Sequence, residues 1–569
     1  MDKTLNYEWR LSATNMRYRP KFVYIVCLSC VHYVCSLFVS TPVVEVSQGK
    51  LRGLRSFSGQ NRYYGIPYAV SKRFQPPKLP KKWSGVYHAV SRFDSCAQSF
   101  AIFQFGVEDC HRLDVYTPAS GHKLPVLVFF HGGAYYYGSK WHYDPEFLVK
   151  KNVIVVTVNY RLGVLGFLCL NNVANLGLKD QVAALRWIQK NIAAFGGDPD
   201  NVTISGYSAG ATSAAMHLLS KRSTGLFHKA ILMSGVPLTP WAFNPEPLTP
   251  AFEDAAKIAK VQNESDVYNT FLTSPLTDVL SATKGTSIDP RYFKYSPCVD
   301  TEFSDAFFHN TPYDTITSGD FNKVPMIVGF TDMEGALFYG LNNQRTLEYL
   351  DNNFVDRLPS VFSWCSNDDK REIAKKIRSY YFSKDSISSR AAVRGGVDYY
   401  SDWISYGAVD AFSKLMAKYS DAPVYNYMFS YKGGRNFGSL MFSGKLEVSG
   451  ATHSDDLFYV FKPGGLTLGL SSSDRLIIDR HATMLTNFMK VGEPTPHTTP
   501  LLPVRWPATT ANRSQILHID RQLSVSDMPA SHQGRFLLEL LCEHGQPGFV
   551  PCESHRNCNL QIDVRGNWQ

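Results

Sequence analysis

The sequence lacks the features that mark proteins outside the ordinary globular class. It has no internal repeat, no heptad run and no low-complexity tract, which excludes solenoids, long coiled coils and largely disordered chains. Its formal net charge is +9, but the basic residues form no stripe interleaved with aromatic side chains. We therefore expect no nucleic-acid partner. No apolar tail and no retention tetrapeptide stands near its C-terminus, so we expect no C-terminal anchor.

Apolar residues are plentiful, at 44% of 569 positions against 19% charged, which is enough to bury a large core. Continuous apolar runs of strand length alternate with helical patterns; the runs are Leu124–Phe130, Val153–Val158, Val202–Ser205, Ala230–Ser234, Val324–Phe330 and Pro423–Phe429. This alternation predicts an α/β fold with a large, mostly parallel central sheet covered by helices on both faces. We expect one domain over residues 41–545 and a C-terminal tail over 546–569.

The first 40 residues are typical of a secretory signal peptide. A basic cluster precedes Phe22–Val39, which is mostly apolar and ends near small residues. The alternative is an uncleaved signal anchor, although Ser29, His32 and Ser36 make this segment a poor membrane span. We therefore expect a secreted chain without a stable membrane span.

Cysteines and glycosylation sequons agree with the secretory pathway. Cys96 and Cys110 would close a short loop, whereas the remaining cysteines beyond the leader cannot be paired from sequence. Asn201, Asn263 and Asn512 each begin an N-x-S/T sequon. Asn201 adjoins a predicted strand, so we predict glycosylation at Asn263 and Asn512.

Residues Asn201–Gly210, NVTISGYSAG, contain a G-x-S-x-G pattern between a predicted strand and a small-residue helix, Ala209–Leu219. This order predicts a nucleophile elbow, a sharp strand-to-helix turn that exposes a serine at its tip. The flanking glycines are needed because a β-carbon there would collide with the strand or the helix. Ser208 is thus the candidate nucleophile, with a plain glycine-rich turn as the alternative.

Candidates for the other parts of an acyl-transfer site lie at the ends of predicted strands. The run Leu124–Phe130 leads into His131-Gly-Gly-Ala, so the N–H groups of Gly133 and Ala134 could face the same carbonyl oxygen as the N–H of Ala209. In hydrolases whose serine lies on a nucleophile elbow, the acid and the histidine follow the nucleophile in the chain. Glu334 follows Val324–Phe330, with Asp332 as its nearest rival, and His453 lies in the loop-like segment GATHSDD.

With these motifs together, the chain resembles the type-B carboxylesterases of the α/β-hydrolase fold and is most similar to insect-type secreted carboxylesterases. The resemblance runs from about Val43 to Cys542. It rests on GIPYA at Gly65, EDCHRLDVYTP at Glu108, HGGAYYYG at His131, NYRLGVLGF at Asn159, GLKDQVAALRWIQKNIAAFGGDP at Gly177, GYSAG at Gly206 and GATHSDDL at Gly450.

Carried over position by position, the resemblance implies Ser208 as nucleophile, His453 as base, Glu334 as acid, and Gly133, Ala134 and Ala209 as oxyanion donors. It also implies a Cys96–Cys110 disulfide and structural ion pairs of Arg73 with Glu108 and of Arg161 with Asp180. No metal or organic cofactor is implied.

The chain departs from the family pattern at several positions. The Cys96–Cys110 loop contains no tryptophan, whereas cholinesterases use one there to hold a quaternary ammonium, so we argue against a cholinesterase. Tyr207 stands where juvenile hormone esterases usually have glutamine, which counts against that specificity. His111 and Arg112 replace the usual hydrophobic and aromatic pair.

The sequence therefore predicts a secreted serine carboxylesterase that hydrolyses small hydrophobic esters of dietary, xenobiotic or odorant type through an acyl-enzyme. One alternative is a non-catalytic adhesion or interaction protein on the same fold. A juvenile-hormone-type esterase is a second alternative, and a lipase is disfavoured because nothing marks a lid.

Overall fold

The structure is a computed structural model that describes residues 40–552, except for 101–102, 171–172, 285–292, 302–303, 384–385, 447–448, 465–469 and 529–531. The predicted signal segment lies outside the described residues apart from Ser40. So does the predicted tail beyond residue 552.

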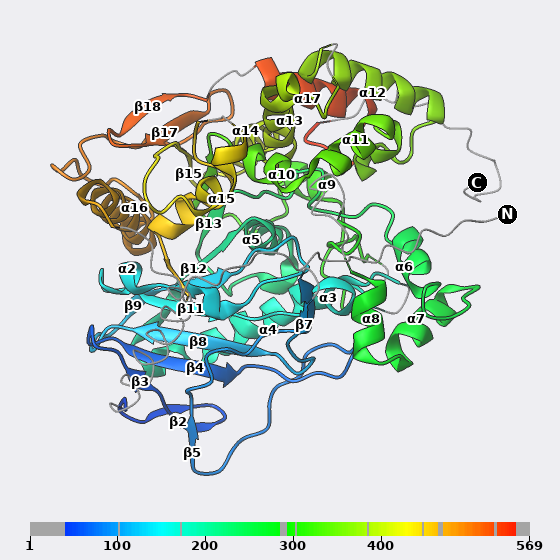
Figure 1. Cartoon of the computed structure of the whole chain (residues 1–569). Helices are drawn as coiled ribbons and strands as arrows, with labels where there is room; N and C mark the ends of the chain where they lie inside the picture. The colour runs from blue at the N-terminus through cyan, green and yellow to red at the C-terminus, as the bar shows by residue number, and fades with distance from the viewer. Residues whose placement is uncertain are drawn as a thin grey trace, which may run out of the picture.

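A central sheet of eleven described strands organises the molecule (Figure 1). Its order is β18-β17-β15-β14-β13-β12-β9-β11-β8-β4-β3. The bounds are β3 (Leu54–Arg55), β4 (Asn61–Pro67), β8 (Arg112–Thr117), β9 (Leu124–Phe130), β11 (Ile154–Val158), β12 (Gly197–Tyr207), β13 (Lys229–Met233), β14 (Met326–Thr331), β15 (Val424–Phe429), β17 (Gln515–Ile519) and β18 (Ser524–Asp527).

The strands from β11 through β17 are all parallel, and the strands at both edges of the sheet are antiparallel. The prediction of a mostly parallel sheet is therefore confirmed. The register pairs Phe130 with Gly206, and Tyr207 with Met233. The carboxyl ends of the central strands thus meet at one edge of the sheet, where the loops that follow them come together.

Alternate residues of the strands enter different cores, and this places helices on both faces. In β9, Val126, Val128 and Phe130 pack into a core with α4 (Leu176–Asn191), α5 (Ala209–Leu219) and α14 (Tyr406–Tyr419). Leu127 and Phe129 point the other way, into a core with α2 (Glu146–Val149) and α16 (Ser472–Val491). Each fully buried side chain of this size contributes about 1.5–3 kcal/mol. The prediction of helices on both faces is confirmed.

A group of helices at the top of Figure 1 packs around a third core that includes Trp403 and Tyr399. It comprises α10 (Gly335–Leu341), α11 (Gln344–Asn352), α12 (Asn367–Tyr381), α13 (Val393–Ile404) and α17 (His532–His544). The first part of the predicted tail packs here, because Val550 is buried and the Gln546 N–H donates to the Val361 carbonyl. A disulfide joins Cys542 to Cys552.

The remaining described elements are short. The helices are α3 (Gly163–Phe167), α6 (Leu248–Ala255), α7 (Glu264–Thr273), α8 (Leu276–Ala282), α9 (Pro312–Thr317) and α15 (Phe437–Leu446). The strands are β1 (Val44–Val46), β2 (Gly49–Arg52), β5 (Val86–His88), β6 (Gln98–Phe100), β7 (Phe103–Phe105), β10 (Tyr143–Asp144) and β16 (Lys462–Pro463). In the described part of the chain no helix combines the length and the apolarity needed to cross a bilayer.

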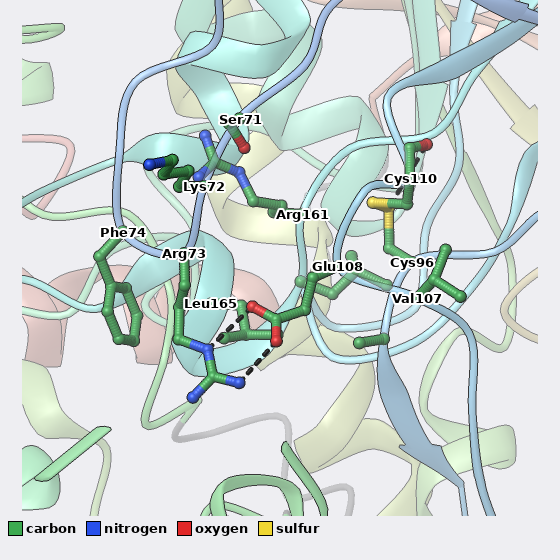
Figure 2. Close-up of a pocket in the computed structure, with 12 residues that line it drawn as sticks. Ser71, Lys72, Arg73, Phe74, Cys96, Val107, Glu108, Cys110, Arg161 and Leu165 are labelled. Atoms are coloured by element: carbon green, nitrogen blue, oxygen red, sulfur yellow. Dashed lines mark hydrogen bonds and ion pairs between the residues drawn. A yellow bond between two sulfur atoms is a disulfide. The ribbon is translucent and has the colours of Figure 1, made fainter. Parts of the chain in front are cut away.

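Strands β6 and β7 form the disulfide hairpin, residues 96–110, which is closed by a Cys96–Cys110 bond. Beside it, the Arg73 guanidinium pairs with the Glu108 carboxylate through two hydrogen bonds of 2.8 and 2.5 Å, as Figure 2 shows. A second disulfide, Cys169–Cys298, was not predictable from sequence because its cysteines stand 129 residues apart.

The second ion pair that the resemblance implies also forms. Arg161 donates to Asp180 at 2.8 and 2.7 Å. Burial alone would raise the pKa of the Asp180 carboxyl, but the charges and hydrogen bonds of Arg161 and His111 together outweigh it and the pKa is lowered. This pair holds the start of α4 against the loop after β11, because the Arg161 side chain comes from that loop.

Candidate active site

Ser208 lies between the last residue of β12 and the first residue of α5, and its φ is +55°. The two glycines around it are required by contact. A β-carbon on Gly206 would lie 2.1 Å from the Gly210 carbonyl oxygen, and one on Gly210 would lie 2.1 Å from the Phe130 oxygen. The Ser208 N–H donates to the Met233 carbonyl at 2.8 Å, which ties the turn to β13. The G-x-S-x-G segment therefore forms the sharp turn that its sequence predicts.

His453 reaches Ser208 from the loop that follows α15. Its Nε2 lies 2.9 Å from the Ser208 Oγ, and its Nδ1 lies 2.5 Å from the Glu334 Oε2. The imidazole contacts the rings of Tyr207 and Phe338, at centroid distances of 4.9 and 5.0 Å. The structure thus brings the three sequence-predicted side chains into one hydrogen-bonded chain.

Glu334 lies just after β14 and its side chain is fully buried. Its Oε1 accepts hydrogen bonds from the Ser234 hydroxyl at 2.7 Å and the Thr331 N–H at 2.8 Å. Because a carboxylate only accepts, His453 donates to it from Nδ1, and Nε2 remains as the acceptor for the Ser208 hydroxyl. This tautomer is the one that a general base for Ser208 needs.

Asp332, the rival candidate for the acid, instead supports the histidine loop. Its Oδ1 accepts from the Ala451 N–H at 2.7 Å, and the Met333 N–H donates to the Ala451 carbonyl at 2.9 Å. Burial raises the pKa of the Asp332 carboxyl to about 7. On the other side of the loop, Asp455 accepts from the Thr452 N–H at 2.8 Å. These contacts fix the backbone on which His453 is carried.

The HGGA segment turns sharply beside the nucleophile. Gly133, Ala134 and Tyr135 have φ values of +118°, +55° and +63°, and the Gly133 carbonyl accepts from the N–H groups of Tyr136 and Tyr137. Gly132 passes so close that a β-carbon on it would lie 3.1 Å from the Ser208 Cβ. The N–H groups of the predicted donors Gly133, Ala134 and Ala209 have no acceptor among the hydrogen bonds of the described residues. They are therefore available to a ligand.

These groups open onto one cavity of about 480 Å³. Ser208, His453, Gly133 and Ala134 line it together with aromatic side chains, namely Phe100, Phe105, Tyr137, Tyr143, Tyr207, Trp241, Phe293, Phe338, Phe437 and Phe458. Among the described residues that line it there is no Asp, Glu, Lys or Arg. Burial lowers the pKa of His142, another lining residue, to about 4, so its imidazole is uncharged at neutral pH.

Ser234 is the member of this site that the sequence analysis did not single out. It stands directly after β13, the strand beside β14, so its position at a neighbouring strand end was the available signal. No group of three or more His, Cys, Asp or Glu side chains suited to a metal ion occurs among the residues that the structure describes.

A parallel sheet with a serine on a strand-to-helix elbow, and a histidine and a carboxylate on later loops, defines the α/β-hydrolase class. Family and structural comparisons agree with this assignment. Residues 40–537 match the model of the carboxylesterase family, and the chain belongs to this family.

Individual relatives point to the same reaction. The chain is 33% identical to a carboxylic ester hydrolase of Bombus ignitus, covering 74% of this chain and 80% of the relative. It is 31% identical to a juvenile hormone esterase of Tribolium castaneum, covering 82% and 86%. The crystal structure of juvenile hormone esterase from Manduca sexta, with OTFP covalently attached, superposes with a TM-score of 0.77 at 28% identity, covering 88% of this chain and 99% of that one. The protein is a carboxylic ester hydrolase with the α/β-hydrolase fold.

Proposed function

We propose that this protein is a secreted serine carboxylesterase in which Ser208, His453 and Glu334 act as the catalytic triad on neutral hydrophobic esters. The observation that carries the proposal is the continuous hydrogen-bonded chain from the Ser208 Oγ through His453 to the buried Glu334. It ends on a cavity wide enough for a small ester.

In the first half of the reaction, the Ser208 Oγ attacks the carbonyl carbon of the ester while His453 Nε2 takes the hydroxyl proton. The carbonyl oxygen becomes an oxyanion and accepts hydrogen bonds from the N–H groups of Gly133, Ala134 and Ala209. His453 then gives its proton to the alkoxy oxygen, so that the C–O bond breaks and the alcohol leaves.

In the second half, water attacks the carbonyl carbon of the acyl-serine and His453 Nε2 takes a proton from it. The tetrahedral intermediate forms in the same place and collapses as His453 returns the proton to the Ser208 oxygen, releasing the carboxylic acid. Glu334 stabilises the imidazolium that exists between these transfers.

The aromatic, uncharged wall of the cavity supports hydrophobic esters of dietary, xenobiotic or odorant type. Its lining offers many large apolar side chains, but none of the described lining residues is a carboxylate that would pair with a cationic alcohol. Juvenile hormone is a narrower candidate, favoured by the likeness to the Tribolium and Manduca esterases. Tyr207 lines the cavity where such enzymes usually carry glutamine.

Secretion and glycosylation are supported by the disulfides and by the surface positions of two sequons. Asn263 and Asn512 are both exposed. Asn201 is only partly exposed, and its side-chain oxygen accepts from the Lys229 ammonium at 2.6 Å. We propose glycans at Asn263 and Asn512.

Hydrolysis of p-nitrophenyl butyrate by the secreted protein, beside Ser208→Ala and Ser213→Ala, tests the proposal. Ser213 lies one turn further along α5 and its hydroxyl donates to the Ala209 carbonyl, so it is a matched serine outside the triad. We expect Ser208→Ala to lose at least about 10⁴-fold in kcat and Ser213→Ala to stay active. A folded wild-type protein that is inert on all such esters would favour the non-catalytic alternative.

A further inference from the structure

The side chain of Gln98 connects the disulfide hairpin to the oxyanion loop, residues 131–138. Its Nε2 donates to the Gly138 carbonyl at 3.0 Å, and its Oε1 accepts from the Gly138 N–H at 2.9 Å. The same Nε2 also donates to the Cys96 carbonyl at 2.9 Å. Gln98 lines the cavity but is only 2% exposed, so its amide is largely shielded from solvent.

The orientation of this amide is determined by its surroundings. Two carbonyl oxygens, those of Cys96 and Gly138, face Nε2, and one N–H faces Oε1. A flipped amide would place its oxygen against two other acceptors. The site therefore requires a side chain that both donates and accepts at this length, and glutamine is the residue that does so without charge.

Gly138 is the residue through which the hydrogen bonds of Gln98 can affect the oxyanion donors. It closes the loop onto its own start, because a β-carbon on Gly138 would lie 2.4 Å from the His131 Nδ1 and 2.5 Å from the Gly132 oxygen. The donors Gly133 and Ala134 lie between these two points, in a turn whose three consecutive positive φ values are strained for non-glycine residues. Such a turn keeps its shape only if its surroundings hold it. The Gly163 N–H donates to the Tyr135 carbonyl at 2.7 Å, and Gln98 holds the far end at Gly138.

A second contact links the same two segments. The Phe100 ring, on the strand that carries Gln98, meets the Tyr137 ring edge-on at a centroid distance of 5.3 Å. It touches the residue next to Gly138 and packs without setting the direction of any backbone N–H. Gln98, by contrast, fixes the direction of both backbone polar groups of Gly138.

We propose that Gln98 is a positioning residue for catalysis: it holds both backbone polar groups of Gly138 and thereby aims the oxyanion donors at the ester carbonyl. This rests on the proposed function, because it assigns Gly133 and Ala134 to the oxyanion. The disulfide hairpin thus has two roles: it lines part of the cavity, and it positions the oxyanion loop through the side-chain amide of Gln98.

Gln98→Met tests the proposal, because methionine has a similar length and volume but makes none of these hydrogen bonds. Gln104→Met is the matched control. Gln104 lies on the other strand of the same hairpin, and its amide donates to the Thr277 carbonyl and the Ser281 hydroxyl, away from the oxyanion loop. Rates are expressed per active site titrated with a fluorophosphonate, so that a poorly folded fraction does not enter the result.

For Gln98→Met we expect kcat on p-nitrophenyl butyrate to fall about 10- to 100-fold with KM within about threefold, since the oxyanion donors act mainly in the transition state. Affinity for a trifluoromethyl ketone, which forms a tetrahedral adduct with the serine, should fall by a factor similar to that in kcat/KM. Gln98→Glu keeps an acceptor for the Gly138 N–H but places a carboxylate oxygen against two carbonyl oxygens. Its kcat and its affinity for the ketone should fall at least as far as those of Gln98→Met.

The inference is overturned if Gln98→Met keeps the kcat and the ketone affinity of Gln104→Met. It is also overturned if stability falls while the rate per titrated site does not change, because that result assigns Gln98 a structural role alone. An inert wild-type protein would instead defeat the proposed function, so the two failures are distinguishable.

Discussion

Ser208 carries the strain of the site in its own backbone, whose φ of +55° is rare for a residue with a side chain. Neighbouring contacts hold it there, among them the hydrogen bond from its N–H to Met233. Its two partners are held in the same way, Glu334 by Ser234 and Thr331, and His453 by the backbone around Ala451. Because these groups are already in place before the substrate binds, little free energy is spent on rearranging them during the reaction.

Replacing the buried acid should separate Glu334 from its rival. In Glu334→Gln the amide either presents its N–H₂ to His453 Nδ1, which moves the imidazole proton to Nε2, or keeps its oxygen toward His453 and faces the Thr331 N–H with its own N–H₂. In both orientations the negative charge that stabilises the imidazolium is lost. We expect kcat to fall about 10⁴-fold. Asp332→Asn keeps an acceptor for the Ala451 N–H and should stay within about threefold of wild type. Steady-state kinetics that reversed this order would assign the acid to Asp332.

Asp332 should also leave a signature in stability. Its pKa of about 7 in the folded protein lies above the ordinary value of 3.8 that it has when unfolded. The unfolded chain therefore releases this proton first, and the free energy of unfolding falls as the pH rises from about 4 to about 7. Asp332→Asn lacks this contribution, so its urea midpoint should decline less than that of wild type between pH 4.5 and 8. Parallel declines would show that Asp332 titrates normally.

At the scale of elements, the site is assembled because four parallel strands end at one edge of the sheet. Strands β9, β12, β13 and β14 deliver in turn the oxyanion loop, Ser208, Ser234 and Glu334. The elbow can form only because the start of α5, at Gly210, passes very close to the end of β9, at Phe130.

That approach predicts a large effect at Gly210. In Gly210→Ala the new methyl group would meet the Phe130 oxygen at 2.1 Å, a backbone atom that cannot rotate away. We expect a loss of about 3 kcal/mol or more in the free energy of unfolding, together with loss of activity. Gly225→Ala is the comparison, because its φ is +76° but nothing lies within 4 Å, and it should cost about 1–2 kcal/mol from backbone strain alone. Equal losses in urea unfolding would refute the collision argument.

The sequence predicted the elements whose residues follow a strong local rule. Continuous apolar runs located the central strands. The G-x-S-x-G pattern located the elbow because the pattern itself spans only five residues, although the contact that requires Gly210 is made with the distant Phe130. The sequence analysis did not identify Gln98 and Ser234 as members of the site, because their hydrogen-bond partners Gly138 and Glu334 are 40 and 100 residues away in the chain. Nothing local to Asp332 and Glu334 separates the acid from its rival, since both carboxylates follow the same strand and only the fold shows which faces His453.

At the scale of the whole molecule, a chain of formal charge +9 encloses a cavity whose described lining includes no Asp, Glu, Lys or Arg. Surface charge of this size steers charged ligands at low salt, but a neutral ester does not feel it. Desolvating a cation in the cavity costs free energy that no carboxylate of the described lining offsets. Contact with aromatic faces recovers only about 0.5–2 kcal/mol of this cost.

Choline esters should accordingly be poor substrates. Acetylcholine and its uncharged isostere 3,3-dimethylbutyl acetate have the same shape, and we expect kcat/KM to be at least about tenfold higher for the neutral ester. Its kcat/KM should also stay nearly constant from low to moderate salt. A preference for acetylcholine in the same assay would mean that a negative group faces the bound substrate.

The central claim is that Ser208 is the nucleophile of the Ser208-His453-Glu334 triad. It is tested most directly by locating the adduct that a fluorophosphonate ester leaves on the protein. Mass spectrometry of peptides should place one phosphonate on Ser208, with labelling absent in Ser208→Ala and strongly slowed in His453→Ala. A single adduct on another residue, or labelling of Ser208→Ala at the wild-type rate, would contradict the account.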